Sequence, residues 1–204
     1  MSIIRPHIST RFILINTQKN HNIGSSARAI KTMGFNSLHI VNPYDANVLQ
    51  CRKTKTRASG ADDILRHAKK HSTLTEAIQG CGLVCGTGMP VDMYRKRKER
   101  EYIEPRVYFE RVLSDSTIGH SNKNSSVDMQ LTQYLDIAFL FGCETTGMKD
   151  VDMDKCHVML GIPTNPRFGS LNLASAVQII AYEWRMALGG RSSYVVTDND
   201  DVNV

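Results

Sequence analysis

The fold of this chain is decided by the stretch Ile162-Pro-Thr-Asn-Pro-Arg-Phe-Gly-Ser-Leu-Asn-Leu-Ala-Ser-Ala-Val-Gln-Ile-Ile-Ala-Tyr-Glu-Trp184. Its prolines and glycine predict a loop, because no regular element tolerates them at this density. Apolar residues then recur at helical spacing, which predicts an amphipathic helix with Ser170 as its N-cap. Asn172 is a helix-indifferent amide in the predicted first turn. It either caps the helix locally or is held at the helix N-terminus to meet a ligand.

The composition predicts one globular domain. The chain has 204 residues, of which 41% are hydrophobic and 22% are charged, as in ordinary folded domains. No apolar run approaches the roughly 20 residues that cross a bilayer, and the N-terminus lacks the apolar segment of a signal peptide. The five cysteines include no Cys-x-x-Cys pair. We therefore expect free thiols in the reducing cytoplasm and no metal site.

The formal net charge of +5 favours an anionic partner such as nucleic acid. The densest basic run is Arg95-Lys-Arg-Lys98, at the head of a charged tract that reaches Arg111. This run is either a solvated surface or a contact with a phosphate backbone.

Strands and helices are predicted to alternate along the chain. Strands are expected at residues 11–16, 37–41, 82–86, 135–141 and 157–160. Helices are expected at residues 25–33, 58–70 and 74–79, in the second half of the charged tract, as one turn within 148–155, and after residue 170. This alternation predicts a three-layer α/β sandwich with a mostly parallel sheet.

The domain is expected to span residues 1–190. Residues 114–130 are rich in serine, asparagine and aspartate, which predicts an exposed loop or insertion. Residues 191–204 are polar and acidic and are expected to form a disordered tail.

Four loops that follow predicted strands are rich in glycine or amide residues. These loops are residues 16–24, 86–90, 142–147 and 162–172. In a parallel sheet the carboxyl ends of the strands meet at one edge, and ligands bind there. Glycine also lets the backbone approach a ligand closely. The loops therefore predict a shared ligand site.

Common nucleotide and hydrolase motifs are absent from these loops. No G-x-G-x-x-G follows the first strand, and neither a Walker A motif nor a G-x-S-x-G elbow occurs. Glu144 is the single carboxylate of the four loops, which disfavours glycosidase chemistry. Glu144 either caps a turn or forms a salt bridge, or it belongs to the ligand site. Arg28, in the first predicted helix, is either solvated or holds a phosphate near the helix N-terminus.

Taken together, three segments resemble the motifs of the SpoU/TrmH family of RNA ribose 2′-O-methyltransferases, in the SPOUT superfamily. The segments are residues 16–34, 140–147 and 162–176. They occur in the family's order, each at a strand end, and the resemblance spans roughly residues 11–188. Within the family the likeness is closest to the TrmJ type, which methylates tRNA in the anticodon loop. It is carried by the runs Asn22-Ile-Gly-Ser-Ser-Ala-Arg-Ala-Ile-Lys-Thr-Met-Gly34 and Ser170-Leu-Asn-Leu-Ala-Ser-Ala-Val-Gln-Ile-Ile-Ala-Tyr-Glu183.

The resemblance implies a deep trefoil knot in the C-terminal half, a homodimer, and S-adenosylmethionine as the cofactor. Transferred by motif, the cofactor-binding residues are Thr87, Gly88, Gly142, Glu144, Ile162, Pro163, Ser170, Leu171 and Asn172. The implied catalytic residues are Asn22, Arg28 and Glu144. The candidate RNA-binding residues are Arg28, Arg95, Lys96, Arg97 and Lys98.

Methyl transfer to a ribose oxygen requires an in-line approach and loss of the hydroxyl proton. Arginine is a poor base, because its guanidinium stays protonated. Arg28 is therefore expected to bind the adjacent phosphate and to stabilise the developing alkoxide. A phosphate oxygen or a water molecule would then take the proton.

The chain departs from the TrmJ type at Cys143, where those proteins usually carry arginine. The expected function is ribose 2′-O-methylation of tRNA. The alternatives are 2′-O-methylation of ribosomal RNA and a non-catalytic RNA-binding module with the same fold. A dehydrogenase is the least favoured alternative.

Overall fold

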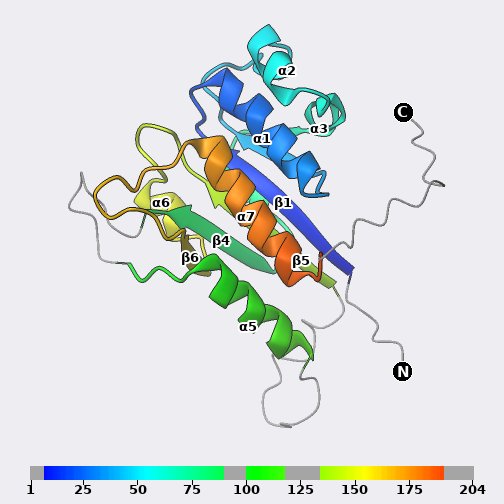
Figure 1. Cartoon of the computed structure of the whole chain (residues 1–204). Coiled ribbons are helices and arrows are strands. Elements are labelled where there is room, and N and C mark those ends of the chain that lie inside the picture. Colours follow the sequence, from blue (N-terminus) through cyan, green and yellow to red (C-terminus); the bar gives the residue numbers. More distant parts are fainter. Residues whose placement is uncertain (1–6, 90–99, 118–133, 191–204) are drawn as a thin grey trace, which may run out of the picture.

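A six-stranded sheet lies between two layers of helices in the computed structural model, which describes residues 7–89, 100–117 and 134–190 (Figure 1). The elements are β1 (His7–Ile15), α1 (Asn20–Thr32), β2 (Leu38–Val41), α2 (Arg52–Ala58), α3 (Asp62–His67), β3 (Lys69–His71), α4 (Leu74–Ile78), β4 (Leu83–Gly88), α5 (Pro105–Thr117), β5 (Tyr134–Phe141), α6 (Asp150–Met153), β6 (Val158–Gly161) and α7 (Leu173–Ala187). The strand order is β3-β2-β1-β5-β4-β6, and all five strand pairings are parallel. The predicted α/β class with a mostly parallel sheet is confirmed.

Successive residues of β1 face opposite helix layers, as the period of two in a strand requires. Phe12 and Leu14 belong to the larger core cluster, which includes residues of α1, α5 and α7. Ile13 and Ile15 belong to a second cluster, which includes residues of α4 and α6. The sheet is therefore buried on both faces, as is usual for a parallel sheet.

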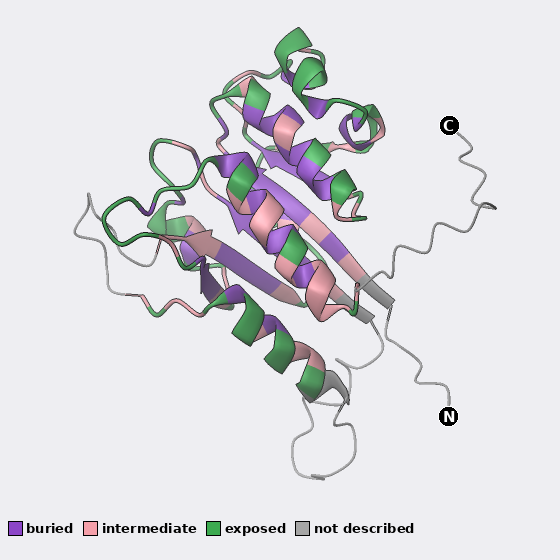
Figure 2. Ribbon diagram, viewed as in Figure 1, coloured by how far each residue is buried: buried purple, intermediate pink, exposed green. Residues whose placement is uncertain are grey.

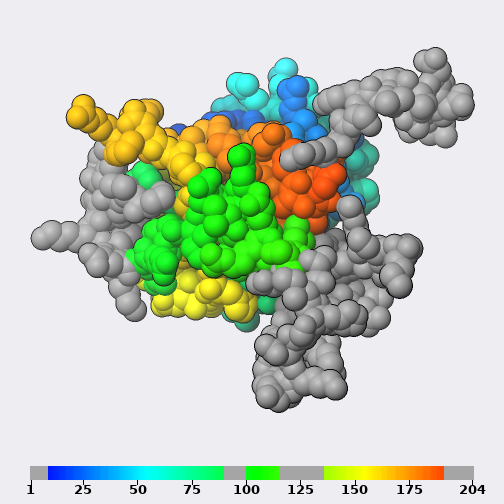
Figure 3. Space-filling model, turned by 60° about the horizontal axis from the view of Figure 1, so that its bottom comes forward, coloured from blue at the N-terminus to red at the C-terminus, as the bar shows by residue number. Residues whose placement is uncertain are grey.

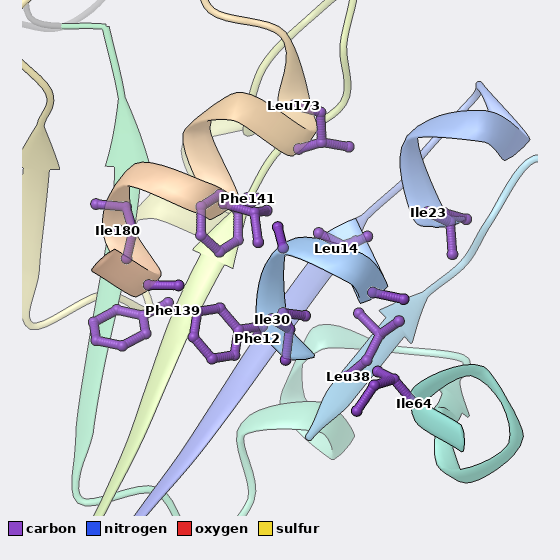
Figure 4. Packing of buried hydrophobic residues seen from close by; sticks show 14 of the residues in the cluster. Phe12, Leu14, Ile23, Ile30, Leu38, Ile64, Phe139, Phe141, Leu173 and Ile180 are labelled. Atoms are coloured by element: carbon purple, nitrogen blue, oxygen red, sulfur yellow. The ribbon is translucent and has the colours of Figure 1, made fainter. Parts of the chain in front are cut away.

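Aromatic rings fill the larger cluster at the centre of the sheet. The ring centroids of Phe12 and Phe139 are 5.6 Å apart, and those of Phe12 and Phe141 are 6.4 Å apart. Figure 4 shows these rings packed with Ile30 of α1 and Ile180 of α7. The two helices thus share one core, which fixes their positions on the sheet.

Trp184 fixes α7 on the sheet and against α5. Its side chain is fully buried, and its indole Nε1 donates a hydrogen bond of 3.0 Å to Oγ1 of Thr10 in β1. Its ring meets Phe109 of α5 and Phe139 of β5 edge-to-face, with centroids 5.1 and 5.8 Å away. Such a tryptophan buries a large apolar area and still pairs its N–H group. Figure 3 shows α5 lying alongside α7.

Helix α2 packs so closely against α1 that the backbones of the two helices are in contact. A Cβ atom added to Gly24 of α1 would lie 2.0 Å from the carbonyl oxygen of Thr54. Thr54 and Ala58 form the buried side of α2, and the Thr54 hydroxyl donates to the carbonyl of Asn20 at 3.2 Å. Only glycine permits this approach.

The predicted helix 58–70 is confirmed only for residues 62–67, which form α3. Ser59 and Gly60 adopt φ values of 41° and 84°, a left-handed conformation that ends a helix. The segment instead contains the end of α2, the short α3 and strand β3. The strand Lys69–His71 pairs with β2 at the sheet edge, and its charged, half-exposed residues give no strand periodicity.

Several boundaries also differ from the sequence predictions. Helix α1 begins five residues earlier than predicted, at Asn20. Ser170 is not the N-cap of α7, because Asn172 takes that position. Helix α5 reaches Thr117, so the first residues of the expected 114–130 insertion are helical. The five predicted strands are confirmed within a few residues, whereas β3 was not predicted.

Some expectations fall outside the described residues. These are the remainder of the insertion, the tail 191–204 and the basic run 95–98. Among the helices that the structure does describe, none is both long enough and apolar enough to cross a membrane.

Substituting Gly24→Ala should lower the free energy of unfolding by about 1–3 kcal/mol, because the new methyl group forces α1 and α2 apart. Urea denaturation monitored by circular dichroism measures this change. Gly82→Ala is the matched control, since a Cβ there would have no neighbour within 4 Å. Equal unfolding midpoints for the two variants would contradict the close packing of α1 on α2.

Candidate functional site

The fold brings the predicted loops to one edge of the sheet. Strands β1, β5, β4 and β6 are neighbours in that order and all parallel. The loops that follow them therefore start at the same edge, as expected for ligand sites in such sheets. Helices α1 and α7 begin there, next to each other in Figure 1.

The carboxylate of Glu144, in the loop after β5, lies at the start of α1. It accepts hydrogen bonds from the backbone N–H of Gln18 at 2.9 Å and of Lys19 at 3.1 Å. The N-cap of α1 is Lys19, whose side chain makes no capping bond. Glu144 thus binds the N–H group of the α1 N-cap and the one before it, 125 and 126 residues away in sequence, where the helix dipole favours an anion. The predicted capping of the turn after Glu144 is not what these bonds show, because the carboxylate accepts from Gln18, Lys19 and Asn22.

Two asparagines extend this contact to α7. Nδ2 of Asn22 donates to Oε1 of Glu144 at 2.9 Å, and Nδ2 of Asn172 donates to Oδ1 of Asn22 at 3.0 Å. Oδ1 of Asn172 accepts from the backbone N–H of Ala174 at 3.0 Å, which is the N-cap bond of α7. The N–H group at one end and the carboxylate at the other set the orientation of both amides.

This amide chain joins the three segments that were singled out in the sequence. Asn22 is buried, with 2% exposure, Glu144 is half-buried, and Asn172 is exposed. Asn172 therefore caps α7, as one alternative predicted, and its amide also bonds Asn22; its contact with a ligand stays a prediction.

The hydrogen bonds keep Glu144 ionised. Burial of the carboxyl opposes ionisation, but the bonds from the Gln18 N–H, the Asn22 amide and the Lys19 N–H outweigh it. The pKa of Glu144 consequently lies below its ordinary value of 4.5. At neutral pH the group is an acceptor and a negative charge, and it is a poor proton donor.

The expected cofactor residues lie at three neighbouring strand ends. Thr87 and Gly88 end β4, and the Thr87 hydroxyl donates to the carbonyl of Leu140 in β5 at 2.8 Å. Gly142 follows β5, and a Cβ atom there would lie 2.2 Å from the backbone nitrogen of Met148. The loop after β5 therefore folds back on itself at a point that only glycine allows.

The loop after β6 supplies the remaining expected residues. Ile162 is buried, whereas Pro163 and Ser170 are exposed. Leu171, which directly precedes Asn172, is 38% exposed and so presents an apolar side chain next to the amide chain. The three strand ends thus present backbone groups, one hydroxyl and one apolar side chain beside the amide chain.

Cys143 is buried, and its sulfur lies 3.4 Å from the Thr145 hydroxyl. Burial raises the pKa of this thiol, but hydrogen bonds from Thr145 and Thr146 outweigh burial and lower it. The position that usually carries arginine in TrmJ-type proteins therefore presents no surface cation here.

Arg28 does not belong to the hydrogen-bonded chain of Glu144, Asn22 and Asn172. Helix α1 begins at Asn20, so Arg28 is in its third turn rather than near its N-terminus. The side chain is exposed, and within the described part of the chain it has no hydrogen-bond or ion-pair partner. Arg28 therefore does not lie at the α1 N-terminus, where Glu144 binds instead, and its contact with a phosphate stays a prediction.

Sequence analysis missed the backbone N–H groups of Gln18 and Lys19, which make two of the three bonds to Glu144. Backbone donors carry no residue signature, so only the position of the loop could have indicated them. Among the described residues, no group of three or more histidine, cysteine or acidic side chains could hold a metal ion.

These features place the chain among α/β proteins whose strand-end loops form a binding site at one edge of a parallel sheet. The model of the SpoU rRNA methylase family matches residues 9–182. The chain belongs to this family, and the resemblance inferred from the three segments is confirmed.

Curated relatives agree with this assignment. The chain is 37% identical over 196 residues to tRNA (cytidine/uridine-2'-O-)-methyltransferase TrmJ of Photorhabdus laumondii, covering 94% of this chain and 70% of that protein. It is 36% identical to an uncharacterized tRNA/rRNA methyltransferase of Haemophilus influenzae, covering 87% of this chain and 63% of that protein. The chain thus spans about two thirds of the length of these relatives.

Solved structures show the same fold. A probable methyltransferase from Bordetella pertussis superimposes with a TM-score of 0.72 at 31% identity, covering 88% of this chain and 95% of that chain. TrmJ from Z. mobilis ZM4 superimposes with a TM-score of 0.66 at 30% identity, covering 89% of this chain and 69% of that chain.

Replacing Glu144 with glutamine should lower the free energy of unfolding by about 1 kcal/mol at neutral pH, because charge-assisted hydrogen bonds are lost. The folded pKa lies below 4.5, so the contribution is complete above pH 4.5 and is lost as the pH falls through the folded pKa. The difference between wild type and Glu144→Gln should therefore shrink below pH 4.5.

Urea titrations between pH 3 and 7 measure this dependence. Glu110→Gln, at an exposed position of α5, is the control and should show no such change. A stability difference for Glu144→Gln that stays constant over this range would contradict the ionised cap.

Proposed function

We propose that the protein transfers a methyl group from S-adenosylmethionine to a ribose 2′-hydroxyl of tRNA, at a cytidine or uridine of the anticodon loop. Family membership and the TrmJ relatives support the reaction and the substrate. The observation that carries the proposal is the hydrogen-bonded chain Glu144–Asn22–Asn172, which unites all three family segments in one site.

The residues at the strand ends suit S-adenosylmethionine. The site offers glycine backbone at Gly88 and Gly142, an exposed hydroxyl at Ser170 and apolar surface at Leu171. Its carboxylate, Glu144, stays ionised and complements a positively charged sulfonium. Thr87, Ile162, Pro163 and Asn172 complete the proposed set. When bound, the cofactor supplies an activated methyl group.

The protein's own residues then position the ribose and manage its proton. Glu144 and Asn22 hold the loops at the site, because their hydrogen-bonding groups already face one another. Arg28 binds the phosphate next to the target ribose and stabilises negative charge on the attacking oxygen. A phosphate oxygen or a water molecule accepts the proton, because neither the guanidinium nor the capped carboxylate is a suitable base at neutral pH.

The working unit in this proposal is a homodimer. Arg28 is exposed and does not contact the amide chain of its own protomer, so it would act on the site of a second copy. The proposal also includes a deep trefoil knot in the C-terminal half of a domain that spans residues 1–190, with the basic run 95–98 assisting RNA binding. The described cysteines are free thiols, which suits action in the cytoplasm.

Incubation with methyl-labelled S-adenosylmethionine and total RNA, followed by mapping of ribose methylation, tests the function. Label in tRNA anticodon loops is the expected result. Label confined to ribosomal RNA would replace the tRNA assignment with the ribosomal alternative. RNA binding without any label would identify a non-catalytic module and refute the proposal.

The variant Arg28→Ala should reduce methyl transfer at least a hundredfold, because the phosphate contact and the charge stabilisation are both lost. Its affinity for S-adenosylmethionine, measured by calorimetry, should stay within about twofold of wild type. Arg66→Ala, at another exposed arginine, is the control. Loss of cofactor affinity in parallel with activity would refute this role of Arg28.

A further inference from the structure

Helix α2 is a densely basic element on the surface. Its sequence Arg52-Lys-Thr-Lys-Thr-Arg57 carries four cations, and each of them is exposed. Figure 2 shows α2 at the top of the molecule, with most of its ribbon exposed. This cationic surface lies on the opposite side of α1 from α7 (Figure 1).

The charges of α2 are not balanced locally. Lys53 and Arg57 are four residues apart, and Arg52 and Lys55 are three apart, so like charges are neighbours on the helix surface. Within the described part of the chain, none of the four side chains forms a hydrogen bond or an ion pair. A short helix with such repulsion is best compensated by an external anion.

Packing on α1 holds these cations outward. Thr54 and Ala58 are the buried residues of α2, and the close approach at Gly24 leaves no room for larger side chains on that face. The cations occupy the remaining positions. Their orientation therefore follows from the same contact that fixes α2 on the domain.

Hydrogen bonds connect an exposed aromatic residue to the site and, through the next residue, to α2. Tyr44, after β2, is 85% exposed, and its backbone N–H donates to the carbonyl of Thr17 at 3.1 Å. Thr17 directly precedes the two residues whose N–H groups bind Glu144. The next residue, Asp45, accepts a bond of 2.7 Å from Asn20, and the Asn20 carbonyl accepts from Thr54 of α2.

We propose that Tyr44 and the α2 cations Arg52, Lys53, Lys55 and Arg57 form a surface that binds single-stranded RNA next to the nucleotide to be methylated. The cations contact phosphates, and the Tyr44 ring stacks on an unpaired base. A basic track combined with an exposed aromatic ring is the arrangement by which proteins hold unpaired nucleic acid. This inference rests on the proposed function and names a part of the substrate that its site must hold.

The test compares two variants with the same change in charge. Lys53→Gln, Lys55→Gln and Arg57→Gln together remove three cations of α2. The control variant removes three exposed cations elsewhere through Lys69→Gln, Arg111→Gln and Lys155→Gln. Lys69 begins β3 and Lys155 lies three residues before β6, so these two cations are at the edge of the sheet opposite the site. Affinity for a tRNA anticodon stem-loop is measured over a range of salt concentrations.

The α2 variant should bind the stem-loop at least tenfold more weakly, and the slope of log affinity against log salt should fall by about two. The control variant should lose less than threefold. Tyr44→Ala should weaken binding about tenfold, whereas Tyr44→Phe should bind like wild type, because stacking needs the ring and not the hydroxyl. Urea midpoints confirm that each variant is folded.

Equal RNA affinity for the two triple variants would overturn the inference, as would equal losses for Tyr44→Ala and Tyr44→Phe. Binding to phosphatidylserine vesicles that depends on α2, with RNA binding unchanged, would overturn it in favour of a membrane surface. The binding assay needs no turnover. A wild type that binds the stem-loop through α2 but methylates no RNA would therefore refute the proposed function while confirming that α2 and Tyr44 bind RNA.

Discussion

The site depends on one constraint at the start of α1: this helix has no side-chain cap of its own. Lys19 occupies the N-cap position without a capping bond, and the carboxylate of Glu144 supplies the missing acceptor from the loop after β5. Free N–H groups at a helix start are costly when no acceptor meets them. The second and third family segments are consequently held together through Asn22 of the first, and the site shares the hydrogen bonds that meet the start of α1.

The site at the sheet edge has two sides, each with its own proposed ligand. The ends of β5, β4 and β6 present the backbone and glycine positions proposed for the cofactor. The side of α1 and α2 presents the cations and Tyr44 proposed for RNA. Asn22 lies between them, donating to Glu144 and accepting from Asn172. A methyl donor and its acceptor must meet at such a boundary, because transfer requires both to be held in line.

Much of this arrangement could be predicted from the sequence, because it depends on local patterns. Apolar runs located five of the six strands, and their alternation with helices predicted the parallel sheet. The three segments indicated that Asn22, Glu144 and Asn172 belong together. What could not be predicted depends on contacts between distant residues: the edge strand Lys69–His71 exists through its pairing with β2, and the cap of α1 comes from more than 120 residues away. The N-cap of α7 was misplaced for a related reason, since Ser170 and Asn172 are both good caps and tertiary contacts decide between them.

A double-mutant cycle on cofactor binding tests the central claim that the amide chain makes one site of the three loops. Asn172→Ser keeps an N-cap for α7 but removes the donor to Asn22, and Asn22→Ala removes the middle of the chain. Calorimetry should show that each variant binds S-adenosylmethionine about tenfold more weakly and that the double variant is hardly weaker than either single variant, because neighbours in one network are not additive. Losses that simply add, or no loss in either single variant, would contradict the account.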